Sequence, residues 1–163
     1  MGRVARRSDT VMRIDDRLQL LGIELPPLSP PVANYVACVL DDPLVYVGGH
    51  GPVAGKEVVH GKVGGELSLE DGYRAARMTA LSILATLKAE LGDLDRIVRI
   101  IKVFGMVNAA PGFTQMPAVI DGCSDVLVDI FGDAGRHTRS AVGLAELPFG
   151  IPVEIELVAR TRP

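Results

Sequence analysis

The sequence predicts a single α+β domain in which a mixed β-sheet packs against two main helices. The chain has 163 residues, which is the length of one domain and is sufficient to bury a hydrophobic core. Apolar residues make up 48% and charged residues 23%, values typical of folded globular chains, so the composition excludes a disordered protein. The hydrophobic pattern changes between strand-like and helical segments in the order ββ(β)αβαββ.

The N-terminal segment has a different pattern from the rest of the chain. Residues 11–22 carry apolar side chains at loosely helical spacing and end at Gly22, which predicts a short helix on the edge of the domain. Residues 25–31 contain four prolines, and this favours an extended connector. We therefore expect residues 1–27 to form an N-terminal helix and proline-rich connector, and residues 28–163 to form the α+β domain.

A β-hairpin is expected after the connector. Two runs rich in β-branched residues, 35–40 and 44–47, flank the turn-forming segment Asp41–Pro43. Residues 53–67 contain glycines at irregular intervals, which predicts an irregular segment with one short strand possible around Glu57–His60.

Two helices follow with clear signals. The first is predicted over 69–91, because Ser68 is a suitable N-cap and Gly92 a suitable terminating residue. Its apolar stripe contains small residues, which indicates close packing against a sheet: Tyr73, Ala76, Ala80, Leu84, Leu87 and Leu91. The second helix is predicted over 113–130, with Pro117 in its first turn.

Three further strands complete the predicted sheet. Residues 97–107 form a long, β-branched run, which is typical of a central strand. Residues 138–145 and 153–160 follow the second helix and are separated by a short turn at Leu147–Pro148. Because of that short turn, we expect these two strands to be antiparallel neighbours.

The charge and composition exclude several functional classes. A formal net charge of −3, 4% aromatic residues and no tryptophan argue against binding to nucleic acid or to an anionic membrane. No apolar run approaches the roughly 18 residues of a membrane span. The basic start of the chain is not followed by the apolar run of a signal peptide. The sequence thus predicts a soluble, cytoplasmic protein.

Neither the cysteines nor the histidines are spaced as metal ligands. Cys38 and Cys123 lie far apart, so we interpret both as small buried hydrophobic residues rather than as part of a disulfide framework or zinc site. His50, His60 and His137 are equally scattered, and no phosphate-binding glycine motif precedes a helix. We expect no metal and no organic cofactor.

The last two strands carry the charged residues that are the best candidates for a functional site. Arg139 begins a strand of small apolar residues, whereas Glu154 and Glu156 interrupt a β-branched one. On adjacent antiparallel strands the arginine and a glutamate would converge on one pocket. The alternative, which composition alone favours, is a cross-strand ion pair on a solvated face.

These residues resemble a known family. Arg139–Val142, Leu147–Pro148 and Val153–Glu156 are similar to the C-terminal signature of the YjgF/Rid family, the reactive-intermediate deaminases formerly called L-PSP endoribonuclease-like. Asn34–Val36 and Tyr46–Pro52 agree with the family pattern in the N-terminal half. The resemblance covers about residues 28–161.

The resemblance implies a chorismate-mutase-like fold that assembles as a homotrimer with ligand sites in clefts between subunits. It implies that Arg139 grips the carboxylate of a 2-imino acid and that Glu154 positions the attacking water, so both are expected to be catalytic. It also places ligand-binding residues along the cleft: Tyr35, Gly49, His50, Arg139, Ser140 and Ala141.

Departures from the family pattern keep three functions open. Ala141, Pro117 and Gly48 stand where many family members have cysteine, asparagine and serine, which leaves the expected pocket less polar. The first function is hydrolytic deamination of 2-imino or enamine acids to 2-oxo acids and ammonia. The second is a non-catalytic homotrimer that binds a small carboxylate or other metabolite. A ribonuclease ranks third, because the chain lacks a basic surface. Whether His50 and His137 face the cleft stays open.

Overall fold

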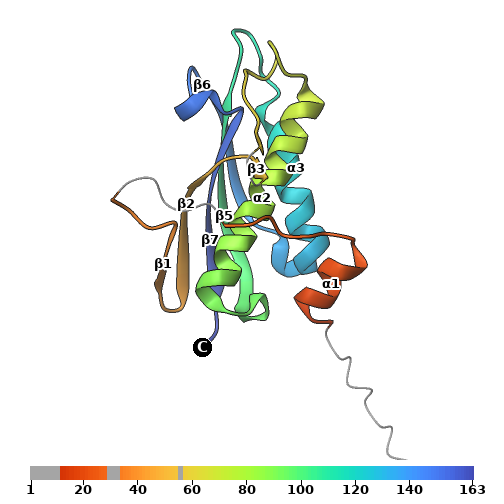
Figure 1. The fold of residues 1–163 in the computed structure, drawn as a ribbon, viewed down its shortest axis with the longest axis vertical. Helices are drawn as coiled ribbons and strands as arrows, with labels where there is room; N and C mark the ends of the chain where they lie inside the picture. Colours follow the sequence, from red (N-terminus) through yellow and green to blue (C-terminus); the bar gives the residue numbers. More distant parts are fainter. Residues whose placement is uncertain (1–11, 29–33, 55–56) are drawn as a thin grey trace, which may run out of the picture.

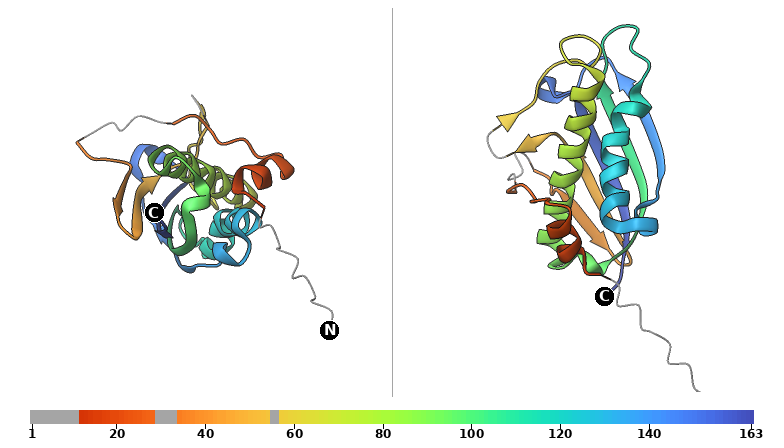
Figure 2. Two further views of the ribbon diagram at one scale, coloured as in Figure 1. Left: turned by 90° about the horizontal axis from the view of Figure 1, so that it is seen from below. Right: turned by 90° about the vertical axis from the view of Figure 1, so that its right-hand side faces the viewer.

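The fold is a five-stranded mixed sheet with its helices on one face, which confirms the predicted α+β class. The computed structural model describes residues 12–28, 34–54 and 57–163. Helices α2 and α3 lie side by side against the sheet (Figure 1, Figure 2). The helices are α1 (Ile14–Leu20), α2 (Leu69–Leu91) and α3 (Met116–Phe131). The strands are β1 (Cys38–Asp41), β2 (Leu44–His50), β3 (Val53–Ala54), β4 (Glu57–Val58), β5 (Ile97–Asn108), β6 (Thr138–Leu144) and β7 (Val153–Thr161).

The sheet order corrects one expectation from the sequence. The strands run β1-β2-β7-β5-β6, so β5 separates the two strands that were predicted to be neighbours. The chain passes from β5 through α3 to β6, and this helical crossover makes β5 and β6 parallel. Strand β7 then pairs antiparallel with the other edge of β5. The prediction that β6 and β7 are adjacent was wrong.

The residues at the two ends of α2 determine where this helix begins and ends. Ser68 and Asp71 form a capping box, in which the Ser68 hydroxyl accepts from the Asp71 amide at 3.1 Å and Asp71 accepts from the Ser68 amide at 2.9 Å. Gly92 ends the helix with a φ of 77°, a left-handed conformation that glycine adopts without strain. Both ends of the predicted helix are therefore confirmed.

Helix α2 approaches α3 closely at Gly122. A side chain added at Gly122 on α3 would overlap the carbonyl oxygen of Tyr73 on α2. A glycine at this crossing lets the two helix backbones come together.

The other elements agree with the prediction within a few residues. The β1–β2 hairpin turns at Asp42–Pro43. Helix α3 begins at Met116, three residues later than predicted, with Pro117 in its first turn. The sequence reading missed β3, which pairs with β4. Of the proline-rich connector, residues 29–33 lie outside the described residues.

Helix α1 packs at the end of the two main helices, as expected of an edge element. Leu18 is buried, and Asp15 accepts from Lys88 on α2 at 2.7 Å. Arg13 forms ion pairs with Asp93 and Asp95, which follow α2. These contacts join the N-terminal segment to the domain.

The alternation along each strand gives the sheet one covered and one open face. Along β7, Val153, Ile155, Leu157 and Ala159 are buried beneath the helices. Glu154, Glu156 and Val158 point to the opposite face, on which the described residues place no α-helix. The largest fully buried side chains include Ile83, Leu84, Leu87, Ile100, Ile120, Leu127, Ile130 and Ile155. Within the described ranges, no helix is long and apolar enough to cross a membrane.

Candidate functional site

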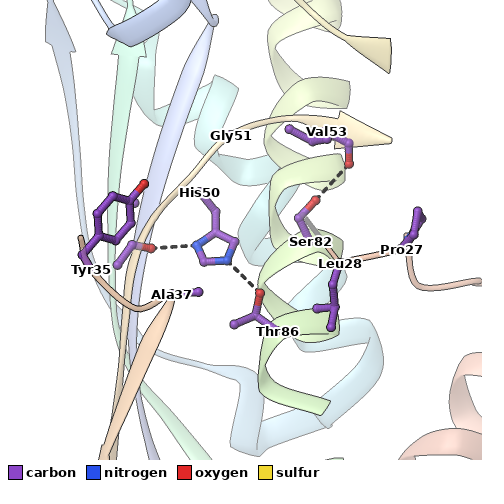
Figure 3. A pocket seen from close by; sticks show the side chains of 11 residues that line it. Pro27, Leu28, Tyr35, Ala37, His50, Gly51, Val53, Ser82 and Thr86 are labelled. Atoms are coloured by element: carbon purple, nitrogen blue, oxygen red, sulfur yellow. Dashed lines mark hydrogen bonds between the residues drawn. The ribbon is translucent and has the colours of Figure 1, made fainter. Parts of the chain in front are cut away.

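The sequence-predicted site residues fall into two groups within one chain. Tyr35, Gly49 and His50 line a cavity of about 140 Å³ between the end of β2 and α2, which we call the β2–α2 pocket (Figure 3). Arg139 lies elsewhere, beside α3, in a cavity of about 230 Å³ that we call the β6–α3 pocket.

His50 connects β2 to α2 across the first pocket. Its Nδ1 lies 2.8 Å from the carbonyl oxygen of Gly48, and its Nε2 lies 2.9 Å from the Thr86 hydroxyl (Figure 3). A carbonyl oxygen only accepts, so Nδ1 carries the proton and Nε2 accepts from Thr86. Burial lowers the pKa of His50 below its usual 6.5, which keeps the ring neutral at pH 7. Both ring nitrogens have partners, so this histidine is held in place.

Glu154 lies on the open face of the sheet, directly over Gly49. The register between β2 and β7 shifts between Val47 and His50, and this irregularity places Gly49 beside the glutamate. A side chain at Gly49 would overlap the Glu154 carboxylate and come within 3.1 Å of its Cγ. Only glycine leaves room for this position of Glu154.

The environment of Glu154 makes its carboxyl a weaker acid than usual. Partial burial raises the pKa of its carboxyl above the usual 4.5, and the nearby charge of Glu156 raises it further. A carboxyl group with a raised pKa exchanges protons closer to neutral pH, which is what an acid or base acting on water requires.

Arg139 points to the helix-covered side of the sheet. Its register partner on β5 is Val103, which is fully buried under the helices. The Arg139 Nη1 donates to Asp121 Oδ1 at 2.8 Å and to Ser124 Oγ at 3.0 Å, both on α3. Its side chain is 23% exposed. The Nε and Nη2 edge of the guanidinium makes no hydrogen bond to the described residues.

The two residues after Arg139 alternate between the faces. Ser140 is exposed and pairs with Phe104, which places it on the open face. Ala141 pairs with Gly105 and packs against the core on the helix side. The edge strand β6 therefore presents the predicted residues to both faces.

Sequence reasoning found Arg139 and Glu154 but not their surroundings. Within one chain they do not meet, because Glu154 lies on the open face and Arg139 lies beneath α3. The cross-strand ion pair of these two residues is absent for the same reason. The sequence reading missed Asp121 and Ser124. Their three-residue spacing places them on one face of α3, and this polar pair beside an apolar stripe was the available signal.

The cysteines and the metal-ligating side chains in the described ranges add no further site. Cys38 and Cys123 are buried and free, as predicted, and burial raises the pKa of the Cys123 thiol to about 12. No group of three potential ligands among the described residues could hold a metal ion.

Comparisons with known proteins agree with the fold. A family model described as "YjgF/chorismate mutase-like, putative endoribonuclease" matches residues 15–158. Protein TCP17 of Trypanosoma cruzi is 41% identical over 148 residues, which cover 88% of this chain and 91% of that protein.

Solved structures show the same architecture. The protein Atu1372 of Agrobacterium tumefaciens, of unknown function, is 40% identical with a TM-score of 0.85, over 91% of this chain and 92% of that one. A Shewanella oneidensis protein described as a "putative endoribonuclease" is 29% identical with a TM-score of 0.88, over 91% and 99% of the two chains. Escherichia coli TdcF, solved with bound serine, is 23% identical with a TM-score of 0.60, over 85% and 94%, and shares the fold. The chain therefore belongs to the YjgF/Rid family of chorismate-mutase-like proteins.

Proposed function

We propose that this protein is a homotrimeric hydrolase that converts 2-imino acids, or their enamine tautomers, to 2-oxo acids and ammonia in clefts between subunits. The observation that carries the proposal is the position of Glu154, a partly buried carboxyl with a raised pKa that lies over a glycine. Arg139 and Glu154 also occupy the positions at which the family signature has its arginine and glutamate.

The separation of Arg139 and Glu154 favours a site made by two subunits. Strand β6 is at the edge of the sheet, so its outer side is free to meet a neighbouring subunit. Arg139, Ser140 and Ala141 on this edge would come from one subunit. Glu154, Gly49, His50 and Tyr35, near the end of β2, would come from the next.

The open face of the sheet supports association of subunits. This face, which no described α-helix covers, carries apolar side chains from the edge strand β1 across to the edge strand β6: Val39 (51% exposed), Tyr46 (46%), Val142 (38%), Phe104 and Val158. An apolar surface of this kind is typical of an interface between copies of a chain.

The two residues divide the chemistry between them. The Nε and Nη2 edge of Arg139, which makes no hydrogen bond to the described residues, has the geometry to bind a carboxylate through two hydrogen bonds. Glu154 takes a proton from water as the water oxygen bonds to the imine carbon. Glu154 returns this proton to the nitrogen, which gives a carbinolamine. The proton of the new hydroxyl then passes through Glu154 to the amino nitrogen, the carbon–nitrogen bond breaks, ammonia leaves, and the carbonyl of the 2-oxo acid forms. Water is the only co-reactant, so the proposal requires no metal or cofactor.

The neighbour TdcF adds support on the ligand. Its structure holds serine, a small molecule with the carboxylate that Arg139 would bind in this chain. A 2-imino acid has the same carboxylate next to the reacting carbon.

A second candidate is a non-catalytic homotrimer that binds a small carboxylate. The less polar side chains at Ala141, Pro117 and Gly48 favour it, because they leave fewer polar groups to act on a bound molecule. A ribonuclease remains the third candidate, and the net charge of −3 gives it no support.

An imine-hydrolysis assay tests the proposal. An amino-acid oxidase generates 2-imino acids in solution, and the rate of 2-oxo acid formation is compared for wild type, Arg139→Ala, Glu154→Gln and buffer. Acceleration by wild type that both variants lose supports the deaminase. Absence of acceleration over several amino acids contradicts it, and carboxylate binding without acceleration supports the second candidate.

A further inference from the structure

The β6–α3 pocket contains a serine–histidine pair that the deaminase chemistry does not use. The Ser124 hydroxyl on α3 lies 3.0 Å from His137 Nε2, and the His137 Nδ1 lies 2.7 Å from the carbonyl oxygen of Gly135. Ser124, His137 and Arg139 line the same cavity of about 230 Å³, together with Val128 and Arg136.

The hydrogen bonds determine which atoms carry protons. Since the Gly135 carbonyl oxygen only accepts, His137 Nδ1 carries the proton and Nε2 presents its lone pair. Arg139 Nη1 donates to Ser124 Oγ, so the Ser124 hydroxyl is left to donate to His137 Nε2. This arrangement of hydroxyl, imidazole and a group that holds the imidazole is the one that activates a serine nucleophile.

The charged groups around the pair keep the imidazole neutral. Burial lowers the pKa of His137 below 6.5, and the nearby charge of Arg139 lowers it further. Arg136 precedes His137 on the same segment, and Asp121 on α3 faces Arg139 rather than the ring. At pH 7 His137 is therefore an unprotonated base hydrogen-bonded to a hydroxyl.

Geometry points to Ser124 as a nucleophile that accepts an acyl group from an activated carboxylic ester, with His137 as its base. Ser124 Oγ bonds to the ester carbonyl carbon, and its proton passes to His137 Nε2. The bond from that carbon to the leaving oxygen then breaks, and His137 returns the proton to the departing alcohol. Arg136 and Arg139 each pair with one carboxylate, Asp133 at 3.4 Å and Asp121 at 2.8 Å, and both arginines line the cavity. We therefore expect the cavity to prefer an acyl group with a second, anionic end.

The experiment uses two 4-nitrophenyl esters, the neutral acetate and the anionic glutarate monoester. Wild-type protein is quenched and digested, and the acylated residue is located by mass spectrometry. We expect acylation at Ser124, faster with the glutarate ester than with the acetate. The peptide with Ser68 is an internal control, because that hydroxyl contacts Asp71 rather than a histidine.

Variants separate a nucleophile from a structural hydroxyl. Ser124→Ala should lose the label, and His137→Gln should slow labelling about 100-fold or more, because glutamine preserves a hydrogen bond but is no base. In the wild type, the labelling rate should be constant near neutral pH and fall on acidification, with a midpoint below 6.5.

Three results would overturn the inference. One is the absence of a label at Ser124 in folded wild-type protein, and a second is equal labelling of wild type and His137→Gln. Labelling that rises in proportion to hydroxide concentration, with no plateau, would likewise exclude His137 as the base. The assay contains no imine, so its failure leaves the proposed deaminase untouched, and the reverse also holds.

Discussion

Arg139 and Glu154 lie on opposite faces of one sheet, with strand β5 between the strands that carry them. Neither side chain can approach the other within a chain without disrupting the sheet. If both act on one ligand, they must come from different subunits. The fold thus makes the proposed activity dependent on assembly, and this dependence shapes the tests that follow.

The glycine under Glu154 offers the sharpest test of the glutamate's position. Gly49→Ala should displace the Glu154 carboxylate, because the new methyl group would overlap it, and imine hydrolysis should fall at least tenfold while the fold persists. Gly48→Ala is the matched control, since its added carbon lies 3.7 Å from the nearest atom, the Ala37 carbonyl oxygen. Steady-state rates and melting curves measure both effects. Equal rates in the two variants would show that Glu154 needs no defined position.

The raised pKa of Glu154 predicts how stability depends on pH. Its ionised form is disfavoured in the folded state, so Glu154→Gln should increase the free energy of unfolding at pH 7. As pH falls through the raised native pKa toward 4.5, the wild-type carboxyl becomes protonated and the advantage of the variant should disappear. Denaturant titrations between pH 4 and 8 measure this difference. A variant that is less stable than wild type at pH 7 would contradict it.

The ion pair between Arg139 and Asp121 predicts opposite effects on carboxylate binding. Arg139→Ala should abolish thermal stabilisation by millimolar 2-oxobutyrate, because the anchor is gone. Asp121→Asn should tighten binding roughly two- to fivefold, since a partly exposed ion pair is worth about 0.4–1 kcal/mol and no longer competes with the ligand. Calorimetric titration gives the affinities. The anchoring role fails if all three proteins respond equally to the ligand.

The crossing of α2 and α3 predicts one of the most destabilising substitutions. Gly122→Ala should lower the free energy of unfolding by about 2–4 kcal/mol, because the methyl group would overlap the backbone of Tyr73 and force the helices apart. Gly132→Ala has open space around it but a φ of 59°, so strain of about 1 kcal/mol is expected. Chemical denaturation compares the two. Similar losses would mean that the helix crossing adjusts freely.

How much the sequence could predict depended on whether a feature is local. Helix α2 has its start signal at Ser68 and its stop at Gly92, next to the residues they govern, and both ends were correct. The short turn at Leu147–Pro148 suggested that β6 and β7 are neighbours, but the α3 crossover, which the turn does not encode, placed β5 between them. The length of a connection limits how far apart two strands can lie, but it does not determine which strand each of them pairs with.

The candidate site also divides into features that the local sequence predicts and features that depend on contacts between distant segments. Arg139 and Glu154 were found from the motif order, whereas Asp121 and Ser124 contact Arg139 across 18 and 15 residues of chain. Their contacts with Arg139 depend on how α3 packs against β6, which the sequence does not show directly. His50 was expected along the cleft, and the structure shows both its ring nitrogens hydrogen-bonded between β2 and α2.

Subunit mixing tests the central claim, a site shared between two chains, most directly. Arg139→Ala and Glu154→Gln proteins, each inactive alone, are unfolded together in equal amounts and refolded, with exchange verified by mass spectrometry. Each site needs an intact arginine from one subunit and an intact glutamate from the next, so random assembly should restore about one quarter of wild-type imine hydrolysis. Mixed oligomers with no activity above that of the separate variants would contradict the account.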